Sequence, residues 1–361
     1  LGCNSPGNAP NPAIIAGQSG AMTRLHSIDG LKFLVALGVV WAHAVLLGSH
    51  FNVTNYIIGQ GLARTAVPTF AVISGFLFHV TWRRGNTRRW IAGMLAVYAF
   101  WCAVYVPVWL PPDPAPGEIL SLLITGPIHL WYMAALVLAV LLISAVLRLS
   151  KDEASARKRL LWLAVGALTV GTTLQSVNFF TAHDIPLNAY RNGIFLEFPY
   201  AVFGFLIAAR LQRHGRAGLP GAPVLWAIVA GLALLRLGEA GLSLTFAGLS
   251  LAAPPEFPPL AVAFSVAVVL AAVRLDLPKP PLNLAYLSMM IYFLHYLMLL
   301  VALSIGVTSQ SGMILLAVLV PVAFALVLQA VWQAVWQALR RRASREDLTP
   351  ERQRFARIRR G

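Results

Sequence analysis

The chain has 361 residues, of which 58% are apolar and only 11% are charged, and its mean hydropathy is +0.72. Soluble domains carry about a quarter of their residues as charged side chains, so this composition excludes a soluble globular enzyme, a disordered chain and a disulfide-linked scaffold. The net charge of +15 is compatible with nucleic-acid binding, but in a membrane protein basic residues usually report topology. We therefore expect an all-α integral membrane protein.

The N-terminal segment, residues 1–21, has neither a basic start nor a long apolar core, so it does not resemble a signal peptide. Met22, followed by Thr-Arg-Leu, is a more natural beginning. We expect residues 1–21 to be a disordered leader or a mis-assigned gene start and residues 22–340 to form one transmembrane domain. Residues 341–361 are expected to be a basic cytoplasmic tail that lies against anionic headgroups.

Ten apolar segments are long enough to be membrane spans, since a helix needs about 20 residues to cross ~30 Å of hydrocarbon. None alternates strictly, as barrel strands would. We predict a bundle of ten transmembrane helices at 31–48, 66–82, 90–110, 127–148, 160–178, 193–210, 223–240, 257–274, 282–304 and 313–339.

The charges of the loops alternate between the two sides of this predicted bundle. One set of loops and both termini hold 25 of the 28 basic residues with seven acids, a net charge of +18, and the other side has a net charge of −3. Positive charge favours the cytoplasmic side. We therefore expect both termini to be cytoplasmic, in a bacterial inner membrane.

The first predicted span has three ionisable residues, Asp29, Lys32 and His43. At about 100° per residue, Lys32 and His43 lie within about 20° of one another on the same helix face and about 16 Å apart along the axis. A buried histidine is the usual general base at neutral pH. The alternative is structural: His43 bonds to a neighbouring carbonyl and Lys32 reaches to the headgroups.

The second span contains Ser74 and Gly75, small residues that allow close helix packing. The loop after it carries Arg83, Arg84, Arg88 and Arg89. Positive-inside bias explains such a loop, but guanidinium groups also bind phosphate in a bidentate manner. Both interpretations remain open on the spacing alone.

Further polar residues lie in the outer halves of three later spans. The fourth begins with His129, Trp131 and Tyr132, and the two aromatic residues are typical of the membrane interface. The sixth contains Glu197, with Arg191 as a candidate partner, and the ninth contains His295. Each ionisable residue within a span is a candidate for function, but a structural role is equally compatible with each one alone. The sequence contains no Walker loop, HExxH, CxxC or GxSxG motif, so no metal site or covalent nucleophile is indicated.

Four of these segments together resemble the acyltransferase 3 family of bacterial membrane proteins. They are SIDGLKFLVALGVVWAH at 27–43, VPTFAVISGFLF at 67–78, HLWY at 129–132 and YLSMMIYFLHY at 286–296. The resemblance implies a ten-helix core and transfer of an acyl group from cytoplasmic acyl-CoA, most simply acetyl-CoA, to a hydroxyl of a surface or exported glycan. Acyl-CoA is then a co-substrate, with no tightly bound cofactor.

The resemblance also implies roles for particular residues. His43 matches the family's essential histidine, and Lys32 stands where the family more often has arginine. Lys32 and the four arginines between positions 83 and 89 are expected to hold the CoA phosphates. The family's RxxR spacing is absent here, so that role is assigned to the cluster and not to a pair. The residues expected on the acceptor side are Asp29, His129, Trp131, Glu197 and His295.

Two other functions use the same residues differently. A proton-coupled transporter or flippase of a sugar or glycan precursor would use the buried histidines and Glu197 as a proton relay, although the sequence lacks the paired, broken helices of many transporters. A membrane protein that only binds partners would have no affinity for CoA.

The acceptor of the acyl group stays open among O-antigen, exopolysaccharide, peptidoglycan, osmoregulated glucan, enterobacterial common antigen and a macrolide.

Overall fold

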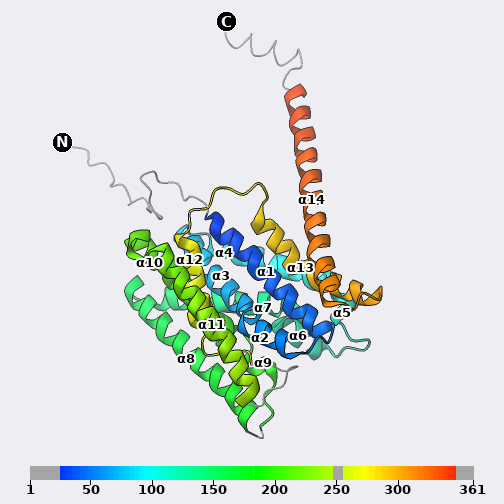
Figure 1. Ribbon diagram of the computed structural model, residues 1–361. Coiled ribbons are helices and arrows are strands. Elements are labelled where there is room, and N and C mark those ends of the chain that lie inside the picture. Colours follow the sequence, from blue (N-terminus) through cyan, green and yellow to red (C-terminus); the bar gives the residue numbers. More distant parts are fainter. Residues whose placement is uncertain (1–24, 182, 247–254, 347–361) are drawn as a thin grey trace, which may run out of the picture.

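The protein is all-helical over the residues that the computed structural model describes, which are 25–181, 183–246 and 255–346, with only the backbone described for 246 and 341–346. The predicted leader 1–21 and most of the predicted tail therefore lie outside the described residues. The helices form one bundle (Figure 1). They are α1 (His26–Leu47), α2 (Val53–Gly61), η1 (Ala63–Thr65), α3 (Ala66–Arg83), α4 (Thr87–Val104), α5 (Val106–Trp109), α6 (Pro116–Thr125), η2 (Ile128–Leu130), α7 (Trp131–Leu149), α8 (Glu153–Phe180), α9 (Leu187–Tyr190), η3 (Gly193–Glu197), α10 (Phe198–His214), η4 (Arg216–Gly218), α11 (Ala222–Phe246), α12 (Ala261–Arg274), α13 (Leu284–Ser304) and α14 (Gln310–Glu346).

Within this described part, eight helical segments are long and apolar enough to cross a membrane. Each overlaps one of the ten predicted spans, and several are longer than predicted. The eight segments are His26–Leu47, Val53–Arg83, Ile128–Leu149, Glu153–Phe180, Leu187–His214, Ala222–Thr245, Leu284–Ser304 and Gln310–Arg340. The count of ten and the cytoplasmic location of the termini stay predictions.

The other two predicted spans, 90–110 and 257–274, contain helices that are interrupted or shortened at prolines. α4 ends at Val104, and the short α5 follows with Pro107 in its first turn. Pro258 and Pro259 precede α12, which begins at Ala261 and has 14 residues. Proline has no backbone N–H and clashes with the preceding turn, so neither apolar segment forms one continuous helix.

α3 and α10 cross at the centre of the bundle with their backbones in close approach. A Cβ atom added to Gly75 would lie 1.8 Å from the carbonyl oxygen of Ala201, and one added to Gly204 would lie 1.8 Å from that of Val72. The prediction that Ser74 and Gly75 serve close packing is therefore confirmed. The Ser74 hydroxyl also bonds to the Tyr132 hydroxyl on α7, at 3.1 Å.

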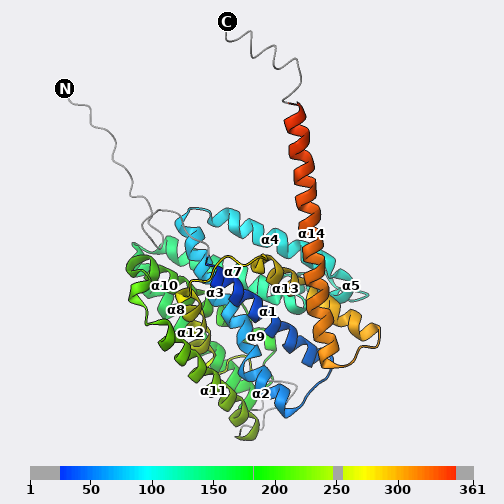
Figure 2. The same cartoon turned by 45° about the horizontal axis from the view of Figure 1, so that its top comes forward.

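α14 packs against α13 and α1 through its first half and then leaves the bundle (Figures 1 and 2). Its first residue, Gln310, exchanges amide hydrogen bonds with Asn55 of α2, at 2.8 and 3.2 Å. Met313, Ala317 and Ala325 are fully buried, whereas almost every residue from 326 to 340 is exposed.

The two ends of the bundle differ in charge. At the end that we call the arginine end, α3 terminates and α4 begins, with Arg83, Arg84, Arg88 and Arg89. At the other end, which we call the α2 end, α1 terminates and α3 begins, joined by α2. His43 lies four residues before the last residue of α1, so it belongs to the α2 half of the bundle.

Candidate active site

Three histidines from three different segments meet in the α2 half of the bundle. They are His43 of α1, His129 of η2 and His295 of α13. The ring centroids are 5.0 Å apart for His43 and His295, 5.1 Å for His129 and His295, and 6.4 Å for His43 and His129. His129 and His295 are buried and His43 is half-buried. We call these residues the histidine cluster.

The hydrogen bonds of this cluster fix which ring nitrogens carry protons in the neutral state. His295 Nδ1 lies 3.0 Å from the carbonyl of Ile291 and 2.7 Å from that of Tyr292. Carbonyl oxygens only accept, so His295 Nδ1 carries the hydrogen and its Nε2 is an acceptor. His43 Nδ1 lies 3.1 Å from that Nε2 and 3.1 Å from the Val39 carbonyl.

Both neighbours of His43 Nδ1 are therefore acceptors, and Nδ1 must donate. A neutral imidazole carries one N–H proton. Because that proton is on His43 Nδ1, His43 Nε2 keeps its lone pair and can accept a proton. No hydrogen bond to this Nε2 is found among the described residues. The assignment follows from the network. It gives His43 the protonation state that a general base needs at the nitrogen directed away from His295.

His129 has a different environment, because neither of its ring nitrogens makes a hydrogen bond of regular geometry in the described part of the chain, although the Phe293 backbone acts on the ring. Only 2% of the residue is exposed, and aromatic rings surround it. Tyr296 stacks on it with centroids 5.4 Å apart, and Tyr105 meets it edge-on at 4.9 Å. Since buried polar groups are usually well paired, a buried imidazole without a regular hydrogen bond is a candidate for ligand binding.

Tyrosines at the histidine cluster were missed in the sequence analysis. The Tyr292 hydroxyl donates to the His129 carbonyl at 2.8 Å, and the Tyr105 hydroxyl donates to the Phe293 carbonyl at 2.6 Å. Tyr292 precedes His295 by three residues and so lies on the same helix face. That spacing could have identified Tyr292 from the sequence. Tyr105 lies beyond the end of α4, and no sequence spacing connects it with the histidines.

Glu197 lies at the end of η3, a π-helical turn, and none of its surface is exposed. Neither carboxylate oxygen has a hydrogen-bond partner among the described residues. Tyr132, Tyr200 and Tyr292 interact with it electrostatically. Tyr292 also contacts His129, so Glu197 is linked to the histidine cluster through aromatic residues and does not contact it directly.

The expected pairing of Arg191 with Glu197 is wrong. Arg191 Nη1 lies 3.5 Å from Glu256 Oε1, and Arg64 Nη2 lies 3.2 Å from the same oxygen. Arg191 also lies over the Trp131 indole, with its guanidinium carbon 4.9 Å from the ring centroid. Glu256 is 59 residues further along the chain than Glu197, and the bundle brings it to Arg191.

A buried arginine, Arg236 of α11, was not singled out as a site residue from the sequence. It is fully buried and donates to the Glu239 carboxylate and to the Gln60 carbonyl of α2. A buried charge is tolerated when it is paired and hydrogen-bonded. These contacts join α11 to α2 and explain Arg236 as a structural residue.

The predicted CoA-binding residues lie toward the arginine end. Lys32 Nζ is 4.0 Å from Asp29 on the same helix. Arg83 is paired with Glu153 of α8, which also bonds to Arg157. Arg84, Arg88 and Arg89 are exposed, and the last two lie in the first turn of α4. Cations are unfavourable at a helix N-terminus, and an anion bound there would compensate them.

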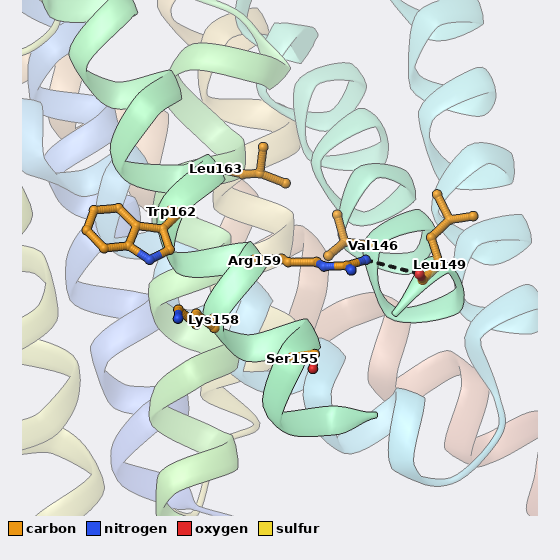
Figure 3. A pocket seen from close by; sticks show the side chains of 7 residues that line it. All are labelled: Val146, Leu149, Ser155, Lys158, Arg159, Trp162 and Leu163. Carbon is orange, nitrogen blue, oxygen red and sulfur yellow. Dashed lines mark hydrogen bonds between the residues drawn. The ribbon is translucent and has the colours of Figure 1, made fainter. Parts of the chain in front are cut away.

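A cavity of about 570 Å³ opens between α7 and α8 near the arginine end (Figure 3). Lys158, Arg159 and Trp162 are among its lining residues, and Arg159 donates to the Leu149 carbonyl at 3.1 Å. None of the predicted site residues lines it. Over the described ranges, no group of three or more His, Cys, Asp or Glu side chains is arranged to hold a metal ion.

Comparisons with known proteins agree with the resemblance carried by the motifs. The acyltransferase 3 family, described as an acyltransferase domain, matches residues 25–332. The serine/alanine racemase of Enterococcus gallinarum is 26% identical over 211 residues, which are 52% of this chain and 30% of the racemase. The aligned region is thus less than a third of that protein. No solved structure matches the chain.

Proposed function

Because this multi-pass membrane protein belongs to the acyltransferase 3 family, we propose that it is an O-acyltransferase that moves an acetyl group from acetyl-CoA to a hydroxyl of a glycan. The observation that carries the proposal is the His43–His295 hydrogen bond, which leaves His43 Nε2 as a proton acceptor. The racemase's activity is not part of the proposal, since that protein and this chain share only a partial alignment.

The chemistry assigned to His43 is general base catalysis. His43 Nε2 accepts the proton of the acceptor hydroxyl while the hydroxyl oxygen attacks the thioester carbonyl carbon. A new C–O bond forms, the C–S bond breaks, and the CoA thiolate takes the proton back from His43. His295 accepts a hydrogen bond from His43 Nδ1 and stabilises the imidazolium that exists between the two proton transfers.

The donor is proposed to bind from the arginine end. Lys32 lies on α1 eleven residues before His43, on the same face, so a ligand along this face reaches from one to the other. Arg84, Arg88 and Arg89 are exposed and bind the CoA phosphates, with Arg83 held by Glu153 beside them. Asp29, which we placed on the acceptor side, lies beside Lys32 and orients it.

The acceptor is proposed to bind at the α2 end. His129 lies next to His43, Trp131 follows His129 by two residues, and Glu197 is linked to His129 through Tyr292. With both termini in the cytoplasm, as the loop charges predict, this end faces outward. The bilayer is then the cytoplasmic membrane of a bacterium, and the acceptor is a surface or exported glycan.

The decisive experiment measures transfer of labelled acetyl groups from acetyl-CoA in membranes that contain the full chain. We expect His43→Ala to lower transfer by about 10²–10⁴-fold, as loss of a positioned base does. His50→Ala is the matched control, because His50 lies outside the histidine cluster, beyond the end of α1. Full transfer by the His43→Ala protein would disprove the mechanism.

One observation favours the alternative of a proton-coupled transporter. Glu197 is a fully buried carboxylate without a hydrogen-bond partner in the described structure, and such a group in a membrane is typical of proton relays. The two functions separate in proteoliposomes. CoA release that requires a sugar acceptor supports the acyltransferase, whereas sugar uptake that follows a pH gradient without acetyl-CoA supports the transporter.

A further inference from the structure

Two arginines and one glutamate form a compact charged group at the α2 end, outside the residues assigned to catalysis. Arg64 follows α2, Arg191 follows α9, and Glu256 lies before α12. A single oxygen, Glu256 Oε1, lies 3.2 Å from Arg64 Nη2 and 3.5 Å from Arg191 Nη1. We call Arg64 and Arg191 the outer arginine pair. The charges of the two arginines and Glu256 sum to +1.

Hydrogen bonds from α2 and α8 hold the backbone around Glu256 in place. Gln175 Oε1 of α8 accepts hydrogen bonds from the backbone N–H groups of Glu256 and Phe257, at 2.6 and 2.8 Å. Gln60 Nε2 donates to the carbonyl of the preceding residue, Pro255, at 2.7 Å. The segment is therefore fixed between α2 and α8, and the position of the carboxylate does not depend on the arginines alone.

The Glu256 carboxylate is buried, whereas the guanidinium groups of Arg64 and Arg191 lie closer to the protein surface. The Glu256 side chain is 8% exposed, whereas the side chains of Arg64 and Arg191 are 29% and 24% exposed. A network that served only to bury charge would cover all three side chains. Here the surplus positive charge is on the accessible side.

The outer arginine pair borders the histidine cluster. Arg191 lies over the Trp131 ring, and Trp131 follows His129 by only two residues. Arg64 and Arg191 both act electrostatically on His43. η1, which contains Arg64, packs against Gly38 of α1, where an added Cβ would lie 3.7 Å from Ala63 Cα. The outer arginine pair is thus connected to the histidine cluster through Trp131 and through η1.

We propose that Arg64 and Arg191 bind an anionic group, phosphate or carboxylate, carried by the acceptor glycan. Guanidinium groups match the geometry of both anions and form strong charge-assisted hydrogen bonds with them. The Trp131 indole offers an aromatic surface beside the anion. The inference rests on the proposed function, because it places the acceptor between these arginines and His43.

The test measures binding without acetyl-CoA, using the full chain in lipid nanodiscs and titration calorimetry. Glucose 1-phosphate, glucuronic acid and glucose are the three probes. We expect at least one anionic sugar to bind about tenfold or more tightly than glucose, a difference of ~1.4 kcal/mol. The phosphate and carboxylate probes identify which anion fits. Arg64→Gln and Arg191→Gln should each remove the difference, and Arg210→Gln, at an exposed position of α10, should preserve it.

A second variant distinguishes anion binding by the arginines from a purely structural role of the ion pairs. Glu256→Gln removes the negative charge but keeps a carbonyl oxygen for the arginines, so the net charge rises from +1 to +2. We expect Glu256→Gln to bind the anionic sugar more tightly than the unaltered protein. A structural ion-pair network would instead give unchanged or weaker binding in this variant.

The proposal is overturned if no anionic sugar binds better than glucose, if either arginine variant keeps that preference, or if Glu256→Gln leaves binding of the anionic sugar unchanged or weaker. These outcomes are independent of acyl transfer. A protein that transfers acetyl groups but shows no preference for anionic sugars refutes the anion subsite alone. A protein that prefers anionic sugars but cannot cleave acetyl-CoA refutes the proposed acyltransferase and leaves the subsite.

Discussion

His295 holds the ring of His43 through a hydrogen bond of 3.1 Å between His295 Nε2 and His43 Nδ1, although 252 residues separate them in the chain. α13 presents His295 with its other nitrogen already bonded to two backbone carbonyls of its own helix. The donor–acceptor direction of the pair is therefore fixed by the backbone of α13. In the proposed mechanism, His295, which the sequence analysis placed among the acceptor-binding residues, acts as a positioning residue for His43.

This relationship predicts different effects for two substitutions at position 295. His295→Leu removes the acceptor for His43 Nδ1, and we expect kcat for acetyl transfer to fall about 10²-fold with little change in the KM for acetyl-CoA. His295→Gln keeps an acceptor oxygen at similar reach and should recover most of the activity. Steady-state kinetics on purified protein measures both parameters. Equal losses in the two variants would show that His295 is needed for packing and not for its acceptor nitrogen.

The exposed arginines at the start of α4 predict an effect on donor binding alone. The double variant Arg88→Gln/Arg89→Gln removes two cations from the proposed phosphate site, and we expect the KM for acetyl-CoA to rise about tenfold or more with kcat unchanged. Arg148→Gln is the control, since Arg148 is also exposed at the arginine end, in the last turn of α7. A uniform rise in KM in both proteins would mean that overall surface charge attracts CoA, without a specific site.

Glu197 predicts opposite effects on stability and activity. Burying a carboxylate without a partner is unfavourable, so Glu197→Gln should stabilise the folded protein by about 1 kcal/mol. If Glu197 serves acceptor binding, the same variant has a raised KM for the acceptor. Thermal unfolding in detergent and acetyl transfer measure the two effects. The matched control is Glu118→Gln on an exposed position of α6. A Glu197→Gln protein that is less stable would show that the carboxylate has a structural partner.

The crossing of α3 and α10 predicts that even one methyl group at Gly75 is destabilising. An alanine Cβ there would lie 1.8 Å from a backbone oxygen, and backbone cannot move aside as a side chain can. We expect Gly75→Ala to lower the free energy of unfolding by about 1–3 kcal/mol, as overpacking does. Gly93→Ala on α4 is the control, because an added Cβ meets nothing within 4 Å. Thermal unfolding of both variants checks this, and equal midpoints would contradict the crossing.

The sequence predicts much of the fold because apolar segments and prolines are local signals. The segments at 31–48 and 282–304 are helices, α1 and α13, since length and composition decide helix formation in a membrane. The segments at 90–110 and 257–274 are different. Pro107, Pro258 and Pro259 interrupt or shorten the helices in these segments, which apolar length alone does not predict.

The candidate site is less accessible to sequence reasoning because it depends on how helices pack. His43, His129 and His295 were each recognisable as unusual within a span, but their convergence comes from the packing of α1, η2 and α13. Arg191 illustrates the same limit. Its partner was sought nearby in the chain at Glu197, whereas the fold provides Glu256.

The glycine crossing of α3 and α10 also restricts how the protein can admit its substrates. α3 extends from beside Arg64 to Arg83, and α10 begins directly after Glu197. With carbonyl groups against Gly75 and Gly204, neither helix can slide past the other without a backbone collision. We therefore expect the two helices to move together as one unit. Opening at either end is then expected from other helices, such as α4, which buries only three of its residues.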